Sequence, residues 1–277
     1  MKNSAEKNVS TFYNGIGWES EGEATEDAIR YEDLRENAQE YVSKCRLRIL
    51  RHIPDRGKYI LDMASGPIQY PEYLKFSENY EKRYCVDLSS KALKDAKAKI
   101  GDRGEFLCGS FFDLDLEDNF FDCAISLHTI YHMDKDKQEQ AVRKLIRVTK
   151  PGQPIIIVYS NPNTFTEYLI TPLKSVKSAF TSAKNTFSSN EQQDKLYFYS
   201  HPLSWWDRFK DEVDIKIVPW RSFYGPQQKI LIPDNAIGKK ALNILFNLEE
   251  KFPNFFVKHF QYPMLILRKK EVTDALN

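Results

Sequence analysis

The chain has 277 residues, of which 42% are hydrophobic, so it is long enough to bury a substantial core. Its formal net charge of +1 at pH 7 creates no global field that would attract nucleic acid or an anionic membrane. The polar N-terminus and the short apolar runs predict a cytoplasmic protein without a secretion signal or a membrane span.

The four cysteines are scattered along the chain without metal-ligand spacing, so no metal site is expected. Cys85, Cys108 and Cys123 lie in predicted strands, which predicts buried free thiols in a reducing compartment.

The N-terminal part divides into an arm and a helix. Residues 1–27 are rich in glycine and acids and predict a loop or a loosely held arm, with Tyr13 and Trp18 as aromatic anchors. From residue 27 to residue 53, apolar residues recur at three- and four-residue steps, which predicts one long amphipathic helix that ends at Pro54.

The next part alternates short apolar runs with helical patterns. Such alternation predicts an open, parallel sheet with helices on both faces. The predicted elements are strand 58–63, helix 68–77, strand 82–87, helix 90–100, strand 105–109, strand 122–128, helix 135–149 and strand 154–160.

Two of these strands end in an acid. Asp62 is followed by the small residues Ala64, Ser65 and Gly66, and Asp87 ends the second strand. Ligands of open α/β sheets bind outside the carboxyl ends of the strands, where small residues allow close approach and an acid can accept hydrogen bonds from ribose hydroxyls. Asp87 lies 87 − 66 = 21 positions after Gly66, close to the roughly 20 of dinucleotide folds. The pattern predicts an adenosine-containing cofactor.

The same residues disfavour a dinucleotide. Ala64 and Ile68 stand where further glycines of the dinucleotide pattern would be expected. Pro67 removes a backbone donor that a pyrophosphate would need, and Asp62 would repel a pyrophosphate but suits a cationic ammonium or sulfonium.

Further motifs follow in the chain, and they lie at 104–112, 121–128, 131–133 and 147–158. With them, residues 55–160 resemble the class I S-adenosylmethionine-dependent methyltransferases, most closely the small-molecule, ubiquinone/menaquinone-type (methyltransferase type 11-like) group. The resemblance implies S-adenosylmethionine as cofactor and S-adenosylhomocysteine as product. It also implies a Rossmann-like, doubly wound α/β fold: a mostly parallel seven-stranded sheet with an antiparallel last strand, plus helical lid insertions.

We therefore expect three parts. Residues 1–54 form an arm and helix that cover the cofactor site, residues 55–160 form the cofactor-binding core, and residues 161–277 form a lid insertion and the final strands. Within the last part the predicted elements are a helix in 163–195, a helix carrying Trp205 and Trp206, a strand at 213–223, a helix near 239–251 and a strand at 260–268.

The resemblance assigns most cofactor contacts to the ends of the first two strands. Asp62 would help hold the methionine end, Ala64, Ser65 and Gly66 would supply close backbone contacts, and Asp87 would bind the ribose. The alternative for both acids is that they only cap the helices that follow.

The resemblance assigns the remaining contacts to the next strand ends. Leu88 would pack beside the adenine, and Ser110 and Phe111 would recognise its edge and face. The family usually has an acid at the position of Ser110, which is equally well explained as a turn residue. Leu127 and His128 would border the methionine moiety.

His132 is the candidate catalytic residue, because it faces the transferred methyl group in this family and its ordinary pKa suits a general base. The alternative is a packing or capping role. Tyr13 would close the cofactor site or serve only as a core anchor. Trp205 and Trp206 could belong to an aromatic box for a cationic amine, but adjacent helical residues cannot both face one cavity, so at least one should be core.

Three functions are consistent with these residues. The first is methyl transfer to an oxygen or nitrogen of a small molecule, favoured by the balanced charge and an aromatic-rich lid. The second is methylation of RNA or protein, for which the best basic face, Lys174, Lys177 and Lys184, is sparse. The third is a cofactor-binding protein without transferase activity. No nucleic-acid or membrane partner is expected, and exposed aromatics in the C-terminal third could form a homodimer.

Overall fold

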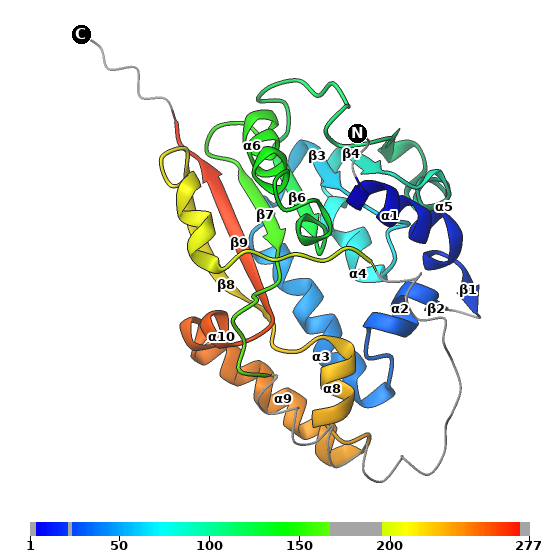
Figure 1. Ribbon diagram of the computed structural model, residues 1–277, viewed down its shortest axis with the longest axis vertical. Coiled ribbons are helices and arrows are strands. Elements are labelled where there is room, and N and C mark those ends of the chain that lie inside the picture. Colours follow the sequence, from blue (N-terminus) through cyan, green and yellow to red (C-terminus); the bar gives the residue numbers. More distant parts are fainter. Residues whose placement is uncertain (1–3, 22–23, 167–195, 272–277) are drawn as a thin grey trace.

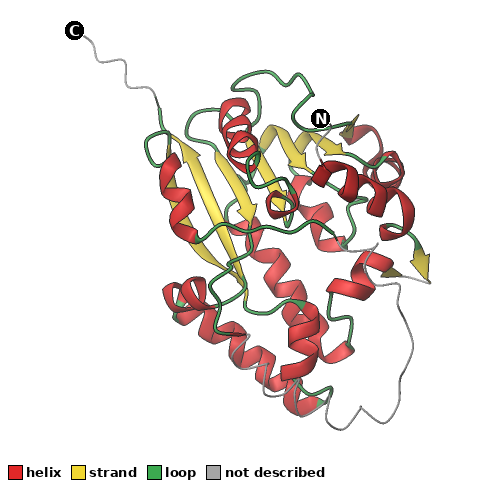
Figure 2. Cartoon of the chain, viewed as in Figure 1, coloured by secondary structure: helices red, strands yellow, loops and turns green. Residues whose placement is uncertain are grey.

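The computed structural model describes residues 4–21, 24–166 and 196–271, and its centre is one seven-stranded sheet (Figures 1 and 2). In spatial order the strands are β5 (Gly104–Cys108), β4 (Tyr80–Asp87), β3 (Gly57–Met63), β6 (Cys123–Leu127), β7 (Pro154–Val158), β9 (Tyr262–Lys269) and β8 (Val213–Arg221). The pairs from β5 to β7 are parallel, and β9 runs antiparallel to both neighbours. The predicted fold, a Rossmann-like sheet with an antiparallel last strand, is confirmed.

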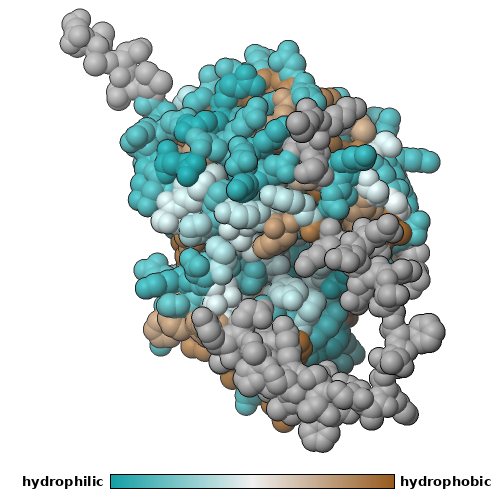
Figure 3. Space-filling view, in the orientation of Figure 1, coloured by the Kyte–Doolittle hydropathy of each residue, from teal (hydrophilic) through white to brown (hydrophobic). Residues whose placement is uncertain are grey.

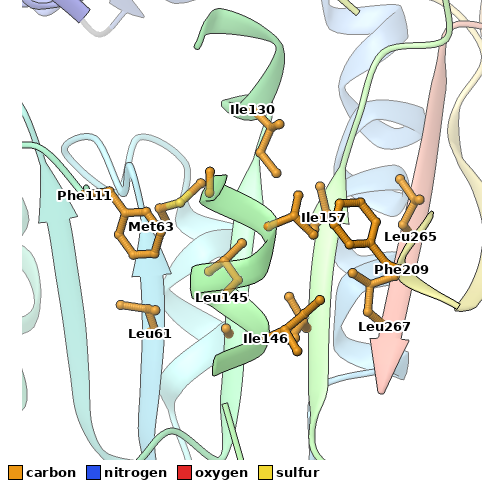
Figure 4. Packing of buried hydrophobic residues seen from close by; sticks show 14 of the residues in the cluster. Leu61, Met63, Phe111, Ile130, Leu145, Ile146, Ile157, Phe209, Leu265 and Leu267 are labelled. Carbon is orange, nitrogen blue, oxygen red and sulfur yellow. The ribbon is translucent and has the colours of Figure 1, made fainter. Parts of the chain in front are cut away.

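Helices cover both faces of the sheet (Figure 1). The helices of the described residues are α1 (Ser4–Phe12), α2 (Glu26–Tyr31), α3 (Glu36–Leu47), α4 (Pro71–Leu74), α5 (Ser90–Ile100), α6 (Gln138–Val148), α8 (Gly225–Leu231), α9 (Ala236–Lys251) and α10 (Pro253–His259). On one face, Leu145 of α6 packs between Leu61 and Ile157 of the strands, together with Phe209 (Figure 4). Since neighbouring strand residues point to opposite faces, burial on both sides explains the apolar runs in these strands.

The N-terminal arm is more regular than the sequence predicted. In place of a loop, residues 4–17 form α1 and a π-helical turn (Tyr13–Gly17), followed by the short hairpin of β1 (Ser20–Glu21) and β2 (Ala24–Thr25). Phe12 and Trp18 are only 6% and 9% exposed, so their burial fixes an arm whose polar composition indicated a loop.

The prediction of one helix from residue 27 to residue 53 is wrong. The chain leaves the helical conformation after α2, and α3 begins at Glu36. Glu32 is extended and buried because it pairs with Arg46 and with Arg221 of β8, and Asp33 holds Arg35 in a second ion pair. An unbroken helix could not turn both acids inward to these partners.

Smaller differences follow local chemistry. The predicted helix 68–77 is reduced to α4 and a 3₁₀ turn (Lys75–Ser77), because Ile68 has φ +49° and Pro71 starts the helix. Cys85 and Cys123 are buried as expected, but Cys108 is exposed because β5 is an edge strand.

Trp205 and Trp206 lie in a 3₁₀ helix (Leu203–Phe209) and are both buried in the core, so they form no aromatic box. The helix predicted within 163–195, with Lys174, Lys177 and Lys184, falls largely on residues 167–195, which lie outside the described residues.

Apolar side chains gather at one end of the molecule, over α9 and α10 (lower left in Figure 3). Ile237, Ile244, Leu248, Phe252 and Phe255 are all exposed there. The homodimer stays a prediction, and these exposed residues are the ones to substitute when it is tested. No described helix has the length and hydropathy needed to cross a membrane.

Candidate active site

A cavity of about 480 Å³ lies at the carboxyl-terminal edge of the sheet, where β3, β4 and β6 end. This volume is within the range of small-molecule sites, roughly 300–1,000 Å³. All of the predicted site residues except Ser110 line it, namely Tyr13, Asp62, Ala64, Ser65, Gly66, Asp87, Leu88, Phe111, Leu127, His128 and His132. The strand order reverses between β3 and β6, the position at which open α/β sheets bind ligands.

The turn after β3 is held in an unusual conformation. Ala64 and Gly66 have φ of +59° and +55°, in the left-handed region that few residues other than glycine adopt. The Gly66 amide donates to Asp87 Oδ2 at 2.9 Å, and the Ser65 amide donates to the Val86 carbonyl at 3.1 Å. Backbone strain of this kind is concentrated at binding sites, where surrounding contacts maintain it.

Asp87 joins the β3 turn to the start of α5. Its Oδ1 accepts a hydrogen bond of 2.8 Å from the Ser89 amide, while Ser89 itself is the N-cap of α5. The residue that caps α5 is therefore Ser89, and not Asp87 as the alternative in the sequence analysis had it. Burial is the largest cause that raises the pKa of Asp87 from 3.8 to about 6, and this marks a carboxyl held in place without a cation.

Asp62 has a partner that the sequence analysis missed. Its Oδ2 accepts hydrogen bonds from Nε of Arg83, at 3.0 Å, and from Nη2 of the same guanidinium. Both side chains are almost completely buried, and Arg83 Nη1 also donates to the Tyr73 carbonyl at 2.7 Å. The sequence did contain an indication of this pair, namely an arginine in the middle of a predicted buried strand. Arginine is rarely buried in a strand without a partner.

Ser110 does not line the cavity. Its hydroxyl accepts a hydrogen bond from the Phe112 amide and donates to Glu6 of α1. Ser110 therefore acts as a turn residue, as the alternative in the sequence analysis had it. Glu6, which the sequence analysis missed, brings a carboxylate to the cavity wall beside it. No local pattern could have found Glu6, because 104 positions separate the two residues.

Two histidines face the cavity beyond β6 in the neutral form. Burial is the largest cause that lowers the pKa of His132 to about 4, and it holds the pKa of His128 well below 6.5. His132 Nδ1 lies 2.7 Å from the Tyr197 carbonyl, so Nδ1 carries the proton and Nε2 has the free lone pair. His128 Nδ1 contacts the Tyr131 hydroxyl at 2.9 Å, and its φ is +58°.

A second group of side chains extends the cavity away from these residues. It comes from α2, from the ends of β8 and β9, and from segments near them, and its members are Tyr31, Glu32, Tyr70, Trp220, Arg221, Tyr224, Gln261 and Tyr262. His128, which belongs to the first group, contacts the second, because its ring lies 4.5 Å from that of Trp220 and 4.8 Å from that of Tyr262.

We expect Gly66→Ala to destabilise the fold by about 1–2 kcal/mol, from left-handed backbone strain, and also to weaken cofactor binding. A Cβ at Gly66 would lie 3.0 Å from the Trp18 ring. Gly101→Ala is the control for cofactor affinity, because Gly101 also has φ +55° but lies outside the cavity, and no atom of the described residues would lie within 4 Å of a Cβ there. Thermal unfolding and calorimetric titration with S-adenosylhomocysteine measure both effects. Equal cofactor affinity in the two variants would contradict the prediction.

The cavity suits the cofactor that the resemblance implies. Gly66 lies directly against Trp18, since a Cβ built on it would lie 3.0 Å from that ring. Carboxylates predominate over Arg221 on the wall, which fits a ligand with a sulfonium and an ammonium. Val86, Leu88 and Phe111 offer apolar surface for a purine. Among the described residues, no cluster of side chains could hold a metal ion.

Comparisons with known proteins agree with this geometry. No curated protein matches the chain. Among solved structures, the chain is similar to geranyl diphosphate C-methyltransferase from Streptomyces coelicolor A3(2), with 12% identity over 97% of this chain and 100% of that one, at a TM-score of 0.57. It is also similar to a chain of the complex between the Haloferax volcanii Trm112 methyltransferase activator and the putative methyltransferase. The identity is 13% over 98% of this chain and 100% of that one, at a TM-score of 0.53.

At these identities, the solved structures show the fold alone. The sequence itself adds that residues 61–157, from β3 to β7, match the family described as a methyltransferase domain. The fold and this match together identify residues 61–157 as the domain of a class I S-adenosylmethionine-dependent methyltransferase.

Proposed function

We propose that this methyltransferase acts on an oxygen or nitrogen of a small-molecule acceptor, which binds inside the cavity. The observation that supports this most directly is the second group of lining residues, which a cofactor at the β3 and β4 ends does not need. A concave site with aromatic walls and a few polar groups is typical of small-molecule binding.

We also propose that three parts of the chain contribute different residues to the site. Residues 1–54 supply Tyr13 and Trp18 over the Gly66 turn, residues 55–160 supply the predicted cofactor contacts, and the described part after residue 196 supplies Trp220 and Tyr262. Glu6, beside Ser110 and Phe111, is the proposed acceptor for the adenine amino group, in place of the acid that the family has at Ser110.

When bound, the cofactor supplies a methyl group activated by a positive sulfur. The chain has to align the acceptor, exclude water and accept a proton. His132 Nε2 is the proposed proton acceptor. Its lowered pKa, about 4, makes it a weak base. A weak base is sufficient where the acceptor becomes strongly acidic as it gains the methyl group, as a hydroxyl does.

His132→Ala is expected to lower turnover by about 100-fold or more, because a positioned base contributes roughly 10²–10⁴-fold. Affinity for S-adenosylhomocysteine should remain within threefold of wild type. The control is His201→Ala, since His201 stacks on Trp205 outside the cavity. Single-turnover assays with labelled methyl donor measure the rate, and an unchanged rate on the true acceptor would return His132 to a packing role.

Thermal unfolding with S-adenosylhomocysteine, S-adenosylmethionine and NADH in parallel tests the proposal first. Ligand at 100 times its dissociation constant should stabilise the protein by about 2.7 kcal/mol. We expect the two sulfur nucleosides to raise the melting temperature and NADH to leave it unchanged. A screen of hydroxyl and amine acceptors with labelled methyl donor follows, and label incorporated only into RNA or protein would overturn the small-molecule proposal.

A further inference from the structure

The acids on the cavity wall differ in how their charges are balanced. Glu32 pairs with Arg46 Nη2 at 2.9 Å and with Arg221, and Asp62 pairs with Arg83. Asp27 of α2 also lines the cavity, but among residues 4–21, 24–166 and 196–271 it forms no ion pair. Asp27 is partly buried, and a partly buried carboxylate without a cation favours a cationic ligand beside it.

Asp27 is fixed in place by neighbours on both sides. Tyr13 Oη donates to Asp27 Oδ1 at 3.1 Å, and Gln69, which also contacts Thr25, gives a further side-chain hydrogen bond. α2 itself packs against α8 and against the π-helical turn that carries Tyr13. The carboxylate is therefore preorganised, and a ligand would gain its charge without ordering a loose side chain.

Five tyrosines line the same cavity as this carboxylate, and one of them, Tyr13, is hydrogen-bonded to it. They are Tyr13, Tyr31, Tyr70, Tyr131 and Tyr262. Aromatic faces attract cations, and the wall already shows this chemistry, because the Arg46 guanidinium lies 3.3 Å from the Tyr70 ring centroid. An anion among tyrosines is the arrangement that binds an organic ammonium.

Asp27 lies on the same helix as part of the second group of lining residues. Tyr31, one helical turn further along α2, and Glu32, directly after α2, both belong to that group. The ammonium of the cofactor itself is expected near Asp62, at the end of β3. Burial raises the pKa of Asp27 to about 6, so the carboxylate is ionised at neutral pH and can hold a cation.

We propose that the acceptor is an amino compound whose ammonium group binds against Asp27, beside the tyrosine rings that line the same cavity. This rests on the proposed function and narrows it to acceptors that carry a protonated amine. Asp27 is then the residue that selects the acceptor, while the atom that receives the methyl group lies nearer His128 and His132.

The test uses the full chain saturated with S-adenosylhomocysteine and two matched probes, benzylamine and the uncharged benzyl alcohol. Calorimetry should show benzylamine binding at least tenfold tighter than benzyl alcohol. Asp27→Asn keeps the shape of the side chain and should remove this preference. Glu26→Gln removes the same charge one residue earlier, outside the cavity, and should retain it.

Three results would overturn the inference. They are equal binding of the two probes by wild type, a preference that persists in Asp27→Asn, and a loss of S-adenosylhomocysteine affinity in Asp27→Asn of more than tenfold. The last would show that Asp27 holds the cofactor instead. Failure of the proposed function would give a different result. The wild-type protein would then bind no S-adenosylhomocysteine, or it would methylate neither hydroxyl nor amine acceptors.

Discussion

Asp87→Ala is expected to lower the affinity for S-adenosylhomocysteine by about 10²- to 10⁴-fold. Two hydrogen bonds from ribose hydroxyls to a carboxylate contribute about 1.5–3 kcal/mol each, and every 1.4 kcal/mol corresponds to a factor of ten. The same change frees the Gly66 amide from its 2.9 Å hydrogen bond, so the turn that should contact the cofactor is also loosened.

The fold should withstand this loss. Folding raises the pKa of Asp87 from 3.8 to about 6. A carboxyl with a raised pKa stabilises the folded state below pH 3.8, and this contribution is lost as the pH rises through 6. At pH 7 the ionised group is therefore unfavourable for folding, and its removal offsets the two lost backbone hydrogen bonds.

Calorimetric titration and thermal unfolding at pH 7 measure both quantities. Asp95→Ala is the matched control, because Asp95 is an exposed acid on α5, the helix that begins just after Asp87. A melting temperature close to wild type combined with an affinity within threefold of wild type would refute the ribose assignment.

The strands that carry the site could be predicted because their signals are local. The run Tyr59–Leu61 is apolar, the acid Asp62 follows it, and small residues begin at Ala64, so each of these properties is read from neighbouring positions. The topology then brings the ends of β3, β4 and β6 to one edge, which explains why nearly all predicted residues share one cavity.

Partners distant in sequence account for the corrections. The break between α2 and α3 depends on Glu32 and Arg221, which are 189 positions apart. A pairing at that separation leaves no periodic signal in either segment, so the amphipathic pattern wrongly favoured one helix. Asp27 was missed for the same reason, since four of the five tyrosines that line its cavity, Tyr13, Tyr70, Tyr131 and Tyr262, lie outside α2.

Arg83→Leu is expected to destabilise the protein by about 3–5 kcal/mol, the usual cost when one partner of a buried ion pair is removed. Arg83 is 1% exposed and Asp62 is 3% exposed, so the remaining carboxylate would have neither water nor a cation. The leucine also cannot donate to the Tyr73 carbonyl, as Arg83 Nη1 does. The loss is greater than for a surface pair, which contributes about 0–1 kcal/mol.

Urea unfolding at pH 7 measures this loss as a shift of the midpoint. Arg103→Leu is the control, because Arg103 is exposed and also donates to a backbone carbonyl, that of Glu78. The double variant Asp62→Asn/Arg83→Leu separates the two causes. If the unpaired charge dominates, the double variant recovers most of the stability, whereas a loss through packing would persist. A midpoint for Arg83→Leu equal to that of Arg103→Leu would mean that the ion pair contributes nothing, and Asp62 would then be free to serve the cofactor alone.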